Sequence, residues 1–404
     1  MKIRSLMVSV HYPNKYHLWT PWNKYANLAI SRLNDIEIEV IAPLPFSPPI
    51  RYLPYNEFSK IPLIEYSEEG TLHHPRFLYL LPKKIFYRFI GEFYRRSVSK
   101  YILNNIKKPD LIHAHQIYPD GYGVMELCKE WKIPLIVEVH STGSLKTWLK
   151  DDKIKNKVFK VIQFSSRIFC ISKELFEMLS ELGIPREKIE IIPLGVDENK
   201  FKPQKKISRK DLDLNEEKLL LLLLFVGRLH KLKGIDILLK AVSQIKNDIN
   251  NFRLVIIGKG SEKENLIDLS KKLNIEDYVT FTGELEEDML VKWYSAADLF
   301  ILPTTYPEGR PVVIYEAMAS GCPIIATNLA GISEQIKEGY NGILIRPKNL
   351  DKLADVIKDL LKNDDLMKRM GENGRKRILE ENWTWKGYAD KNLEIYEKVI
   401  NNEN

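Results

Sequence analysis

Short aliphatic and β-branched runs alternate with amphipathic helical segments through almost the whole chain, and this alternation restricts the fold more than any other feature. Several of the runs lack polar residues at alternate positions, as expected for parallel strands that are covered on both faces. A chain that repeats strand and then helix forms a parallel, doubly wound sheet. The predicted strands span 3–10, 36–42, 111–114, 135–140, 168–171 and 189–193, and then 219–226, 253–257, 279–281, 299–302, 323–327 and 343–345.

The pattern occurs twice, and a chain of 404 residues is long enough for two such domains. The charged, turn-like stretch "DENKFKPQKKISRK" separates the two halves and contains Pro203. We therefore expect one Rossmann-like domain over residues 1–202 and a second over residues 203–384. The tail, about 385–404, has apolar residues at helical spacing and predicts a further helix.

The formal net charge of +7 is unevenly placed along the chain. Residues 1–200 contain 29 Lys and Arg against 22 Asp and Glu, whereas residues 201–404 contain 32 of each kind. This asymmetry indicates an anionic partner for the first half. Three distant cysteines, Cys128, Cys170 and Cys322, predict buried reduced thiols in a cytoplasmic protein. The longest apolar run suits a buried strand and is too short to cross a membrane.

The stretch "FVGRLHKLKG" places basic residues directly after a predicted buried strand. Arg228 and Lys233 stand in a loop, and Gly234 opens a helix. A guanidinium, an ammonium and free N–H groups at a helix start are suited to binding a diphosphate. A solvated basic loop is an equally good interpretation of this stretch alone.

The stretch "PEGRPVVIYEAMASGCPIIAT" places two glutamates around the start of another predicted helix. Glu308 lies in the loop after a strand, Pro311 suits the first helical position, and Glu316 lies within the helix. Carboxylates accept hydrogen bonds from paired hydroxyls of a sugar or ribose. A helix-cap charge at Glu308 and a surface position for Glu316 are the alternative, although the neighbours of Glu316 are apolar.

These motifs together resemble the retaining glycosyltransferases of family four. "GRLHKLKG", "EGRPVVIYEAMASGCPIIAT" and "AGISE" are similar to its C-terminal domain, and "DLIHAH", "PLIVEVHSTGS", "IFCISKEL" and "IIPLGVDENKFKP" are similar to segments of its N-terminal domain. The resemblance implies the GT-B fold, an α/β architecture of two Rossmann-like doubly wound parallel-sheet domains facing each other across a cleft. It implies that the N-terminal domain binds the acceptor, the C-terminal domain binds the nucleotide sugar, and the C-terminal helix crosses back to the N-terminal domain.

The resemblance also implies a role for each matching residue. Arg228 and Lys233 would hold the donor diphosphate and stabilise charge on the leaving nucleotide. Glu316 would bind the ribose hydroxyls, Glu308 would contact the transferred sugar, and His140 would reach that sugar or its phosphate from the other domain. The remaining residues expected at the donor are Gly227, Gly258, Lys259, Gly309 and Arg310.

The resemblance implies a metal-independent retaining hexosyltransferase with no cofactor, whose substrate is a UDP- or GDP-sugar. The D-x-D formed by Asp211 and Asp213 is expected to be incidental. We expect the rings of His113 and His115, two residues apart, to point to opposite sides unless the predicted strand has ended, which would disfavour zinc. One departure from the family is the first loop, "HYPNKYHLWTPWNKYANL", which lacks the glycine pair that many members carry near the donor phosphate.

The acceptor is expected to be a glycan or a lipid-linked molecule, as in enzymes that build cell-surface polysaccharides or glycoconjugates. Candidate acceptor-binding residues are His115, Asp120, Trp19 and Trp22, although a core position is as good an interpretation for the histidine and the tryptophans. Residues 76–108 contain nine Lys and Arg and a single acidic residue, Glu92. Phe86, Phe89, Ile90 and Phe93 form a helical apolar stripe there, which predicts either an anionic-membrane contact at the inner membrane face or an ordinary core helix.

Three other classes of protein share features with this sequence. A nucleotide-sugar epimerase shares the fold and would consume the donor without an acceptor. A dehydrogenase is disfavoured because "GKGSEKEN" lacks the third glycine of the dinucleotide fingerprint. A nucleic-acid binder would fit the basic first half, but the sugar-nucleotide motifs argue against it.

Overall fold

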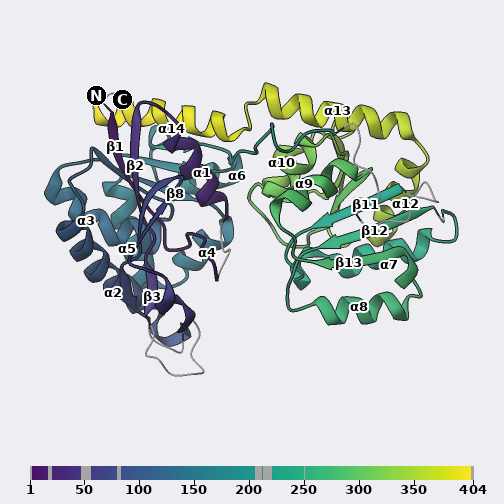
Figure 1. The fold of residues 1–404 in the computed structure, drawn as a ribbon, viewed down its shortest axis with the longest axis horizontal. Helices are drawn as coiled ribbons and strands as arrows, with labels where there is room; N and C mark the ends of the chain where they lie inside the picture. The colour runs from purple at the N-terminus through teal and green to yellow at the C-terminus, as the bar shows by residue number, and fades with distance from the viewer. Residues whose placement is uncertain are drawn as a thin grey trace. The chain divides into compact units, whose positions relative to one another are not determined.

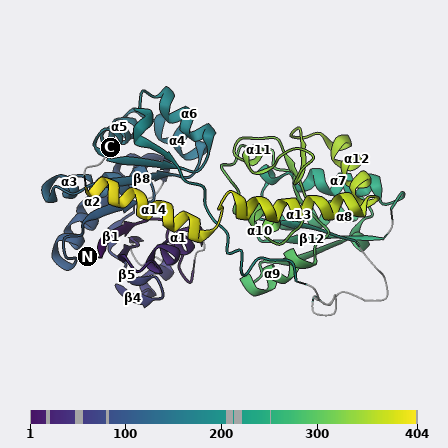
Figure 2. The ribbon, with the colours of Figure 1, turned by 90° about the horizontal axis from the view of Figure 1, so that it is seen from above.

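The computed structural model describes residues 2–16, 21–46, 56–79, 83–204, 212, 221–249 and 251–401. The chain divides into two compact units, and each is described by itself. The first unit comprises Met1–Leu194 with Trp385–Asn404, and the second comprises Gly195–Thr384. Figure 1 shows each unit as a sheet flanked by helices, and Figure 2 shows the same ribbon from above.

The boundary between the units lies earlier in the chain than the predicted 202–203. Residues just after Leu194 are attached to the second unit by their contacts. The Phe201 ring lies 5.7 Å from the Tyr294 ring, centroid to centroid. The Arg375 guanidinium donates to the carbonyl oxygens of Phe201, at 3.1 Å, and Glu198, at 3.2 Å. Aromatic packing and backbone hydrogen bonds therefore outweigh the linker-like composition of this stretch.

The main sheet of the first unit has the strand order β10-β9-β8-β7-β1-β2-β5-β4 within the described residues. Its pairs are parallel except β4 with β5, and the prediction of a parallel sheet is confirmed. Its strands are β1 (Ile3–Val8), β2 (Ile36–Ile41), β4 (Ile64–Ser67), β5 (Gly70–His73), β7 (Leu111–Ala114), β8 (Leu135–Val139), β9 (Arg167–Cys170) and β10 (Ile189–Ile191). The short strands β3 (Leu44–Phe46) and β6 (Arg76–Leu78) pair separately.

The C-terminal helix packs on the first unit, as the sequence predicts. It is α14 (Trp385–Ile400), and it lies beside α1 (Pro21–Ser31), as Figure 2 shows. Tyr388 and Tyr396 are buried by this packing. The other α-helices described in this unit are α2 (Lys83–Asn105), α3 (Tyr122–Trp131), α4 (Thr142–Leu149), α5 (Asp152–Phe164) and α6 (Lys173–Glu181).

The sheet of the second unit is parallel throughout its described pairs and has the order β13-β12-β11-β14-β15-β16. The predicted strands of this half are confirmed, with small shifts at their ends. They are β11 (Leu221–Val226), β12 (Phe252–Ile257), β13 (Val279–Gly283), β14 (Leu299–Leu302), β15 (Ile324–Thr327) and β16 (Gly342–Ile345). The helices are α7 (Ile235–Ile245), α8 (Lys263–Lys272), α9 (Glu287–Ala296), α10 (Val312–Ala319), α11 (Ile332–Gln335), α12 (Leu350–Leu361) and α13 (Asp364–Glu380).

Each sheet has a point at which the chain reverses its direction of travel across the strands. In the second unit the chain moves outward from β11 through β12 and β13, and then crosses to β14 on the other side of β11. In the first unit β2 and β7 lie on opposite sides of β1. Parallel α/β sheets bind ligands beyond the carboxyl ends of the strands at such points. The residues that follow β11 and β14, and those that follow β1, β7 and β8, are therefore the ones to inspect.

The helix α2 buries a different stripe from the one predicted for residues 76–108. Ile90, Tyr94, Val98 and Ile102 are buried at i, i+4, i+8 and i+12, whereas Phe89 is 43% exposed. The Phe86 side chain lies outside the described residues. Ile90 therefore belongs to the core, and only part of the predicted stripe faces solvent. No helix in the described ranges is both long and apolar enough to span a membrane. All three cysteines are buried free thiols.

Candidate active site

The loop after β11 is held against the end of β14 by close backbone packing. Gly234, with φ of +68°, occupies a left-handed conformation, and a Cβ there would lie 2.1 Å from the Pro303 carbonyl oxygen. The Thr305 N–H also donates to the Leu232 carbonyl at 2.8 Å. Only glycine permits this approach, because both the conformation and the space exclude a side chain. The packing brings Lys233 to the loop that carries Glu308.

Lys233 and Glu308 form an ion pair, with Nζ 2.6 Å from Oε2. The other carboxylate oxygen of Glu308 is buried and has no hydrogen-bond partner among the described residues. Arg228, in the same loop as Lys233, is exposed, and its guanidinium forms no hydrogen bond or ion pair with the described residues. Two of the predicted catalytic residues are thus brought together at the switch point of the second sheet, with a free cation in the same loop.

Glu316 is carried by α10, which begins at Val312 after Pro311 and has no side-chain cap at its start. The carboxyl is partly buried, and burial raises its pKa to about 7, against an opposing influence of the Tyr294 hydroxyl. A carboxyl that titrates near neutrality can accept hydrogen bonds from paired hydroxyls once it is ionised. Functional carboxyl groups often have a perturbed pKa. The raised pKa of Glu316, close to the switch point, is therefore consistent with a functional role.

Gly227 and Gly258 contact each other where β11 and β12 end. A Cβ on Gly258 would lie 2.0 Å from the Gly227 carbonyl oxygen, and Gly258 has φ of +141°. The glycines therefore let two loops approach closely at the carboxyl edge of the sheet. Lys259 is largely exposed, and its ammonium contacts Glu284. The structure places these predicted donor residues on the same edge as Arg228.

Arg310 is occupied by contacts inside the second unit. Its guanidinium lies 2.7 Å from a Glu334 oxygen, donates to the Tyr315 hydroxyl at 3.3 Å and lies over the Trp383 ring at 5.2 Å. These contacts favour a structural role for Arg310 over the predicted donor contact. Gly309 is buried, and its carbonyl oxygen would lie 1.7 Å from a Cβ on Gly331, so the two loops are tightly packed here.

In the first unit, polar side chains gather on one face of the sheet near the end of β7. His113 pairs in register with Ile136 of β8, so Glu138 lies on the same face as His113 and His115. The rings of His113 and His115 stack with centroids 5.3 Å apart. The expectation that these rings point to opposite sides is wrong, because residues two apart in a strand share a face.

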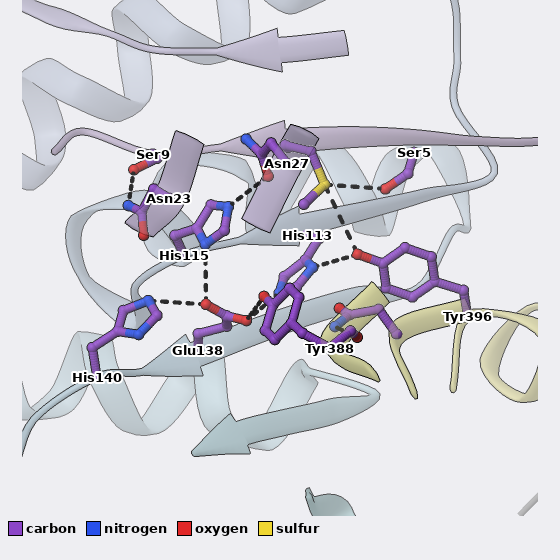
Figure 3. A network of polar contacts seen from close by, with 12 residues as sticks. Ser5, Ser9, Asn23, Asn27, His113, His115, Glu138, His140, Tyr388 and Tyr396 are labelled. Atoms are coloured by element: carbon purple, nitrogen blue, oxygen red, sulfur yellow. Dashed lines mark hydrogen bonds and ion pairs between the residues drawn. The ribbon is translucent and has the colours of Figure 1, made fainter. Parts of the chain in front are cut away.

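The Glu138 carboxylate is the centre of this group, as Figure 3 shows. Oε1 accepts from the Tyr388 hydroxyl at 2.7 Å and lies 3.3 Å from His113 Nε2. Oε2 accepts from His115 Nδ1 at 3.0 Å and lies 2.9 Å from His140 Nε2. Burial alone would raise the pKa of Glu138, but attraction to the three imidazoles holds the pKa well below its usual range. Burial lowers the pKa of His115, against the attraction of Glu138.

Among the described residues, His115, Glu138 and His140 form a cluster that could hold a metal ion. Their three candidate ligand atoms lie within 4.8 Å of one another. Two imidazoles and a carboxylate are suitable zinc ligands. However, His115 Nδ1 and His140 Nε2 already lie 3.0 and 2.9 Å from the same Glu138 oxygen. The histidines and the carboxylate therefore satisfy one another without a metal ion. Asp211 and Asp213, the D-x-D pair, lie outside the described residues.

The remaining predicted acceptor residues are placed as follows. Asp120 is buried, where it accepts from the Tyr94 hydroxyl at 2.5 Å and from the Val10 N–H at 2.9 Å. Burial raises the pKa of Asp120 to about 7. These contacts favour a structural role for Asp120. Trp22 is partly buried in α1, with an indole N–H that has no described partner, and Trp19 lies outside the described residues.

Sequence reasoning missed Glu138 and Tyr388. The signal for Glu138 is a carboxylate in the middle of an apolar strand, "PLIVEVHS", since a buried charge requires partners. Tyr388 was identified only as an apolar position of the last helix. Its hydroxyl meets Glu138 across 250 residues of chain, and no local pattern shows such a contact.

Two family models match the chain. The model described as "Glycosyltransferase Family 4" matches residues 34–200, and the one described as "Glycosyl transferases group 1" matches residues 204–377. Together these matches cover most of the chain, and each lies mainly in one unit. The predictions from the motifs of both halves are therefore confirmed at the level of the family.

Individual relatives agree with the family models. An uncharacterized glycosyltransferase of Methanocaldococcus jannaschii is 27% identical over 84% of this chain and 86% of its own length. A D-inositol 3-phosphate glycosyltransferase of Nocardia farcinica is 28% identical over 72% of this chain and 67% of its own length. An Anabaena protein solved in complex with UDP-glucose is 18% identical and covers 98% of this chain and 100% of its own, with a TM-score of 0.73.

The family models, the relatives and the paired parallel sheets lead to the same assignment. The chain belongs to glycosyltransferase family four and is a glycosyltransferase with the GT-B fold.

Proposed function

We propose that this enzyme transfers a hexose from a nucleotide sugar to a glycan or lipid-linked acceptor, with retention of anomeric configuration and without a metal ion. The reaction would serve the synthesis of a cell-surface polysaccharide or glycoconjugate. The observation that carries the proposal is the Lys233–Glu308 pair, with Nζ 2.6 Å from Oε2, at the switch point of the second sheet.

The residues at this edge suit the successive parts of a nucleotide sugar. Lys233 and the exposed Arg228 offer positive charge to a diphosphate, and this charge matters most as the diphosphate leaves. Glu308 has a buried oxygen without a described partner, which can accept from a sugar hydroxyl. Glu316 can accept from both ribose hydroxyls. A donor with its phosphates at Lys233 would therefore have carboxylates at both hydroxylated ends.

The chemistry requires no nucleophile from the protein. The bond between the anomeric carbon and the diphosphate oxygen breaks, and the acceptor oxygen bonds to that carbon on the same face. The acceptor proton passes to an oxygen of the leaving diphosphate. We propose that His140 contacts the transferred sugar or its phosphate during this step, which gives the first unit a direct part in transfer.

The acceptor class is supported by chemistry and by a relative. The first 200 residues carry the whole excess of positive charge, which favours an acceptor with phosphate groups. The Nocardia farcinica relative is named for a phosphorylated acceptor, D-inositol 3-phosphate. A phosphorylated polyol and a lipid-linked pyrophosphate share this chemistry.

The test begins with a panel of UDP-, GDP- and ADP-sugars in thermal unfolding, because a ligand that binds the folded state raises its stability. The stabilising donor is then incubated with phosphorylated acceptors, and the anomeric configuration of the product is read by NMR. Transfer with retention supports the proposal. Conversion of the donor to an epimer without acceptor would replace it with an epimerase, and binding without any turnover would contradict it.

A further inference from the structure

The Glu138 carboxylate is buried in the first unit and bonded on both oxygens. It is 3% exposed, and the structure directs His113, His115, His140 and Tyr388 at it from β7, the end of β8 and α14. A carboxylate with partners on each oxygen keeps its charge in the protein interior. A buried charge without partners costs free energy of folding. The four side chains and the carboxylate therefore hold one another in place.

His140 differs from the other two histidines in what its second nitrogen meets. His113 Nδ1 contacts the Tyr396 hydroxyl at 2.5 Å, and His115 Nε2 contacts the Asn27 side chain at 3.1 Å. His140 Nδ1 is buried and has no hydrogen-bond partner among the described residues, and His140 Nε2 lies 2.9 Å from Glu138 Oε2 as a close charge contact without hydrogen-bond geometry. Figure 3 shows His140 at the margin of the group, with one ring edge toward Glu138.

We propose that Glu138 is a positioning residue for His140 and that Tyr388 of α14 supports it in this role. The inference rests on the proposed function, in which His140 contacts the donor. Glu138 places the proton of His140 on Nε2, which lies 2.9 Å from a carboxylate oxygen. The negative charge of the carboxylate at this distance favours a hydrogen over a lone pair on Nε2. Nδ1 is then the ring atom left for the sugar or its phosphate.

Tyr388 strengthens this arrangement from the opposite side of the carboxylate. Its hydroxyl donates to Oε1, while the imidazole of His140 meets Oε2. These contacts fix the rotation of the Glu138 carboxylate, and the carboxylate in turn fixes the orientation of the His140 ring. An amide in place of the carboxylate would present an NH₂ group to one pair of donors, because glutamine has one acceptor oxygen where glutamate has two.

The kinetic test compares Glu138→Gln, Glu138→Asp and Tyr388→Phe with the parent enzyme, using the best donor of the panel. We expect Glu138→Gln to lower kcat by about tenfold to a hundredfold with little change in the donor KM, because misplacing a reacting group costs rate more than binding. Glu138→Asp should restore part of this loss, and Tyr388→Phe should show a smaller loss. Tyr388→Phe removes a single hydroxyl and so remains informative if Glu138→Gln does not fold.

The chain offers a matched control in another Glu–His pair of the same sheet. Glu39 Oε2 lies 3.2 Å from His73 Nε2, and the Tyr101 hydroxyl lies 3.0 Å from His73 Nδ1. Glu39→Gln and Tyr101→Phe remove the same kinds of contact outside the Glu138 group. Both should keep the parent kcat. An equal loss in these controls, or a parent kcat in both Glu138→Gln and Tyr388→Phe, would overturn the inference.

A second readout needs no catalysis. The ¹⁵N spectrum of histidine-labelled enzyme, with His140 assigned by its loss in His140→Gln, reports which ring nitrogen carries the proton. We expect Nε2 to be protonated in the parent enzyme and a mixture of tautomers in Glu138→Gln. An unchanged His140 signal in Glu138→Gln would overturn the positioning role. Absence of sugar transfer by the parent enzyme would instead overturn the proposed function, so the two failures are distinguishable.

Discussion

The ammonium of Lys233 lies 2.6 Å from the carboxylate of Glu308, although 75 residues separate them in sequence. The contact joins the loop after β11 to the loop after β14. Both side chains are partly buried, with exposures of 23% and 22%. In the proposed function, the diphosphate would replace Glu308 as the partner of Lys233, and a sugar hydroxyl would replace Lys233 as the partner of Glu308.

We expect Lys233→Ala and Arg228→Ala each to lower turnover by about a hundredfold or more, because each removes charge that stabilises the departing diphosphate. Steady-state kinetics with the stabilising donor measures the loss, and circular dichroism checks that the fold is kept. Lys240→Ala is the matched control, since Lys240 lies on α7 in the same unit, where its ammonium lies 3.5 Å from an Asp236 oxygen one turn away. Near-parental turnover in both test variants would remove the diphosphate assignment.

Donor binding should strengthen as the pH rises from about 6 to 8. Glu316 has a pKa of about 7, and its ionised form accepts hydrogen bonds from both ribose hydroxyls. The change in Kd should be about threefold to tenfold across this range. Calorimetry with an intact nucleotide sugar suits the measurement. Glu316→Gln should bind weakly with a flat profile, and a parental pH dependence in that variant would contradict the assignment.

The same titration affects the stability of the unliganded enzyme in the opposite direction. Burial raises the Glu316 pKa from the ordinary 4.5 to about 7, so folding favours the protonated form. Its stabilising contribution is complete below about pH 4.5 and is lost as the pH rises through about 7. The Tm of Glu316→Gln minus the Tm of the parent should therefore be larger at pH 8 than at pH 5. Equal differences in Tm at both pH values would show that this carboxyl is not perturbed.

Transfer should persist in excess EDTA, because Lys233, Arg228 and the uncapped start of α7 supply the positive charge that an ion would otherwise provide. The measurement is the initial rate before and after chelation, with EDTA removed and Mg²⁺, Mn²⁺ or Zn²⁺ returned separately. Zinc is included because His115, Glu138 and His140 lie together. Loss on chelation with recovery by one ion would show that the charge argument is wrong.

The basic segment 76–108 should bind vesicles of anionic lipid and not neutral ones, with binding weakened by salt. Phe89 is exposed on α2, and Phe46 and Leu78, which pair in register on β3 and β6, are exposed as well. Co-sedimentation measures binding, and reversal of charge at Arg88, Arg95 and Arg96 should reduce it. Charge reversal at Lys398, on α14, is the control. Failure to bind under any condition would leave α2 as an ordinary core helix.

The sequence predicted the two sheets well because their central strands carry strong local signals. β7 and β14 have the predicted bounds, Leu111–Ala114 and Leu299–Leu302. Helix α13 is harder to recognise from sequence, because "MGENG" contains two glycines, which usually indicate a turn. A Cβ on Gly371 would lie 2.0 Å from the Gly321 carbonyl oxygen, so this glycine is required by close packing of the helix. Packing of this kind is invisible in local composition.

The candidate site was predicted unevenly for a similar reason. Lys233 and Glu308 lie in the loops that follow β11 and β14, and Glu316 lies in the helix after β14, so a rule for parallel sheets predicts all three near one edge. Arg310 also follows a strand, but its guanidinium is bound by Glu334, whose position depends on the loop around Gly331. Glu138 requires partners from β7 and α14 that only the assembled fold brings together. Rules about element ends therefore succeed, and contacts between distant side chains do not follow from them.

The return of α14 to the first unit imposes an order on how the chain is completed during synthesis. The second unit, Gly195–Thr384, is continuous and can finish folding as soon as it leaves the ribosome. Most of the first unit is made earlier but lacks Tyr388 and Tyr396, so Glu138 and His113 gain these partners only after α14 has been translated. The histidine cluster of the earliest-made sheet is thus completed after the second unit, and a chain that stops before Trp385 contains the whole of the second unit but lacks the tyrosines that contact Glu138 and His113.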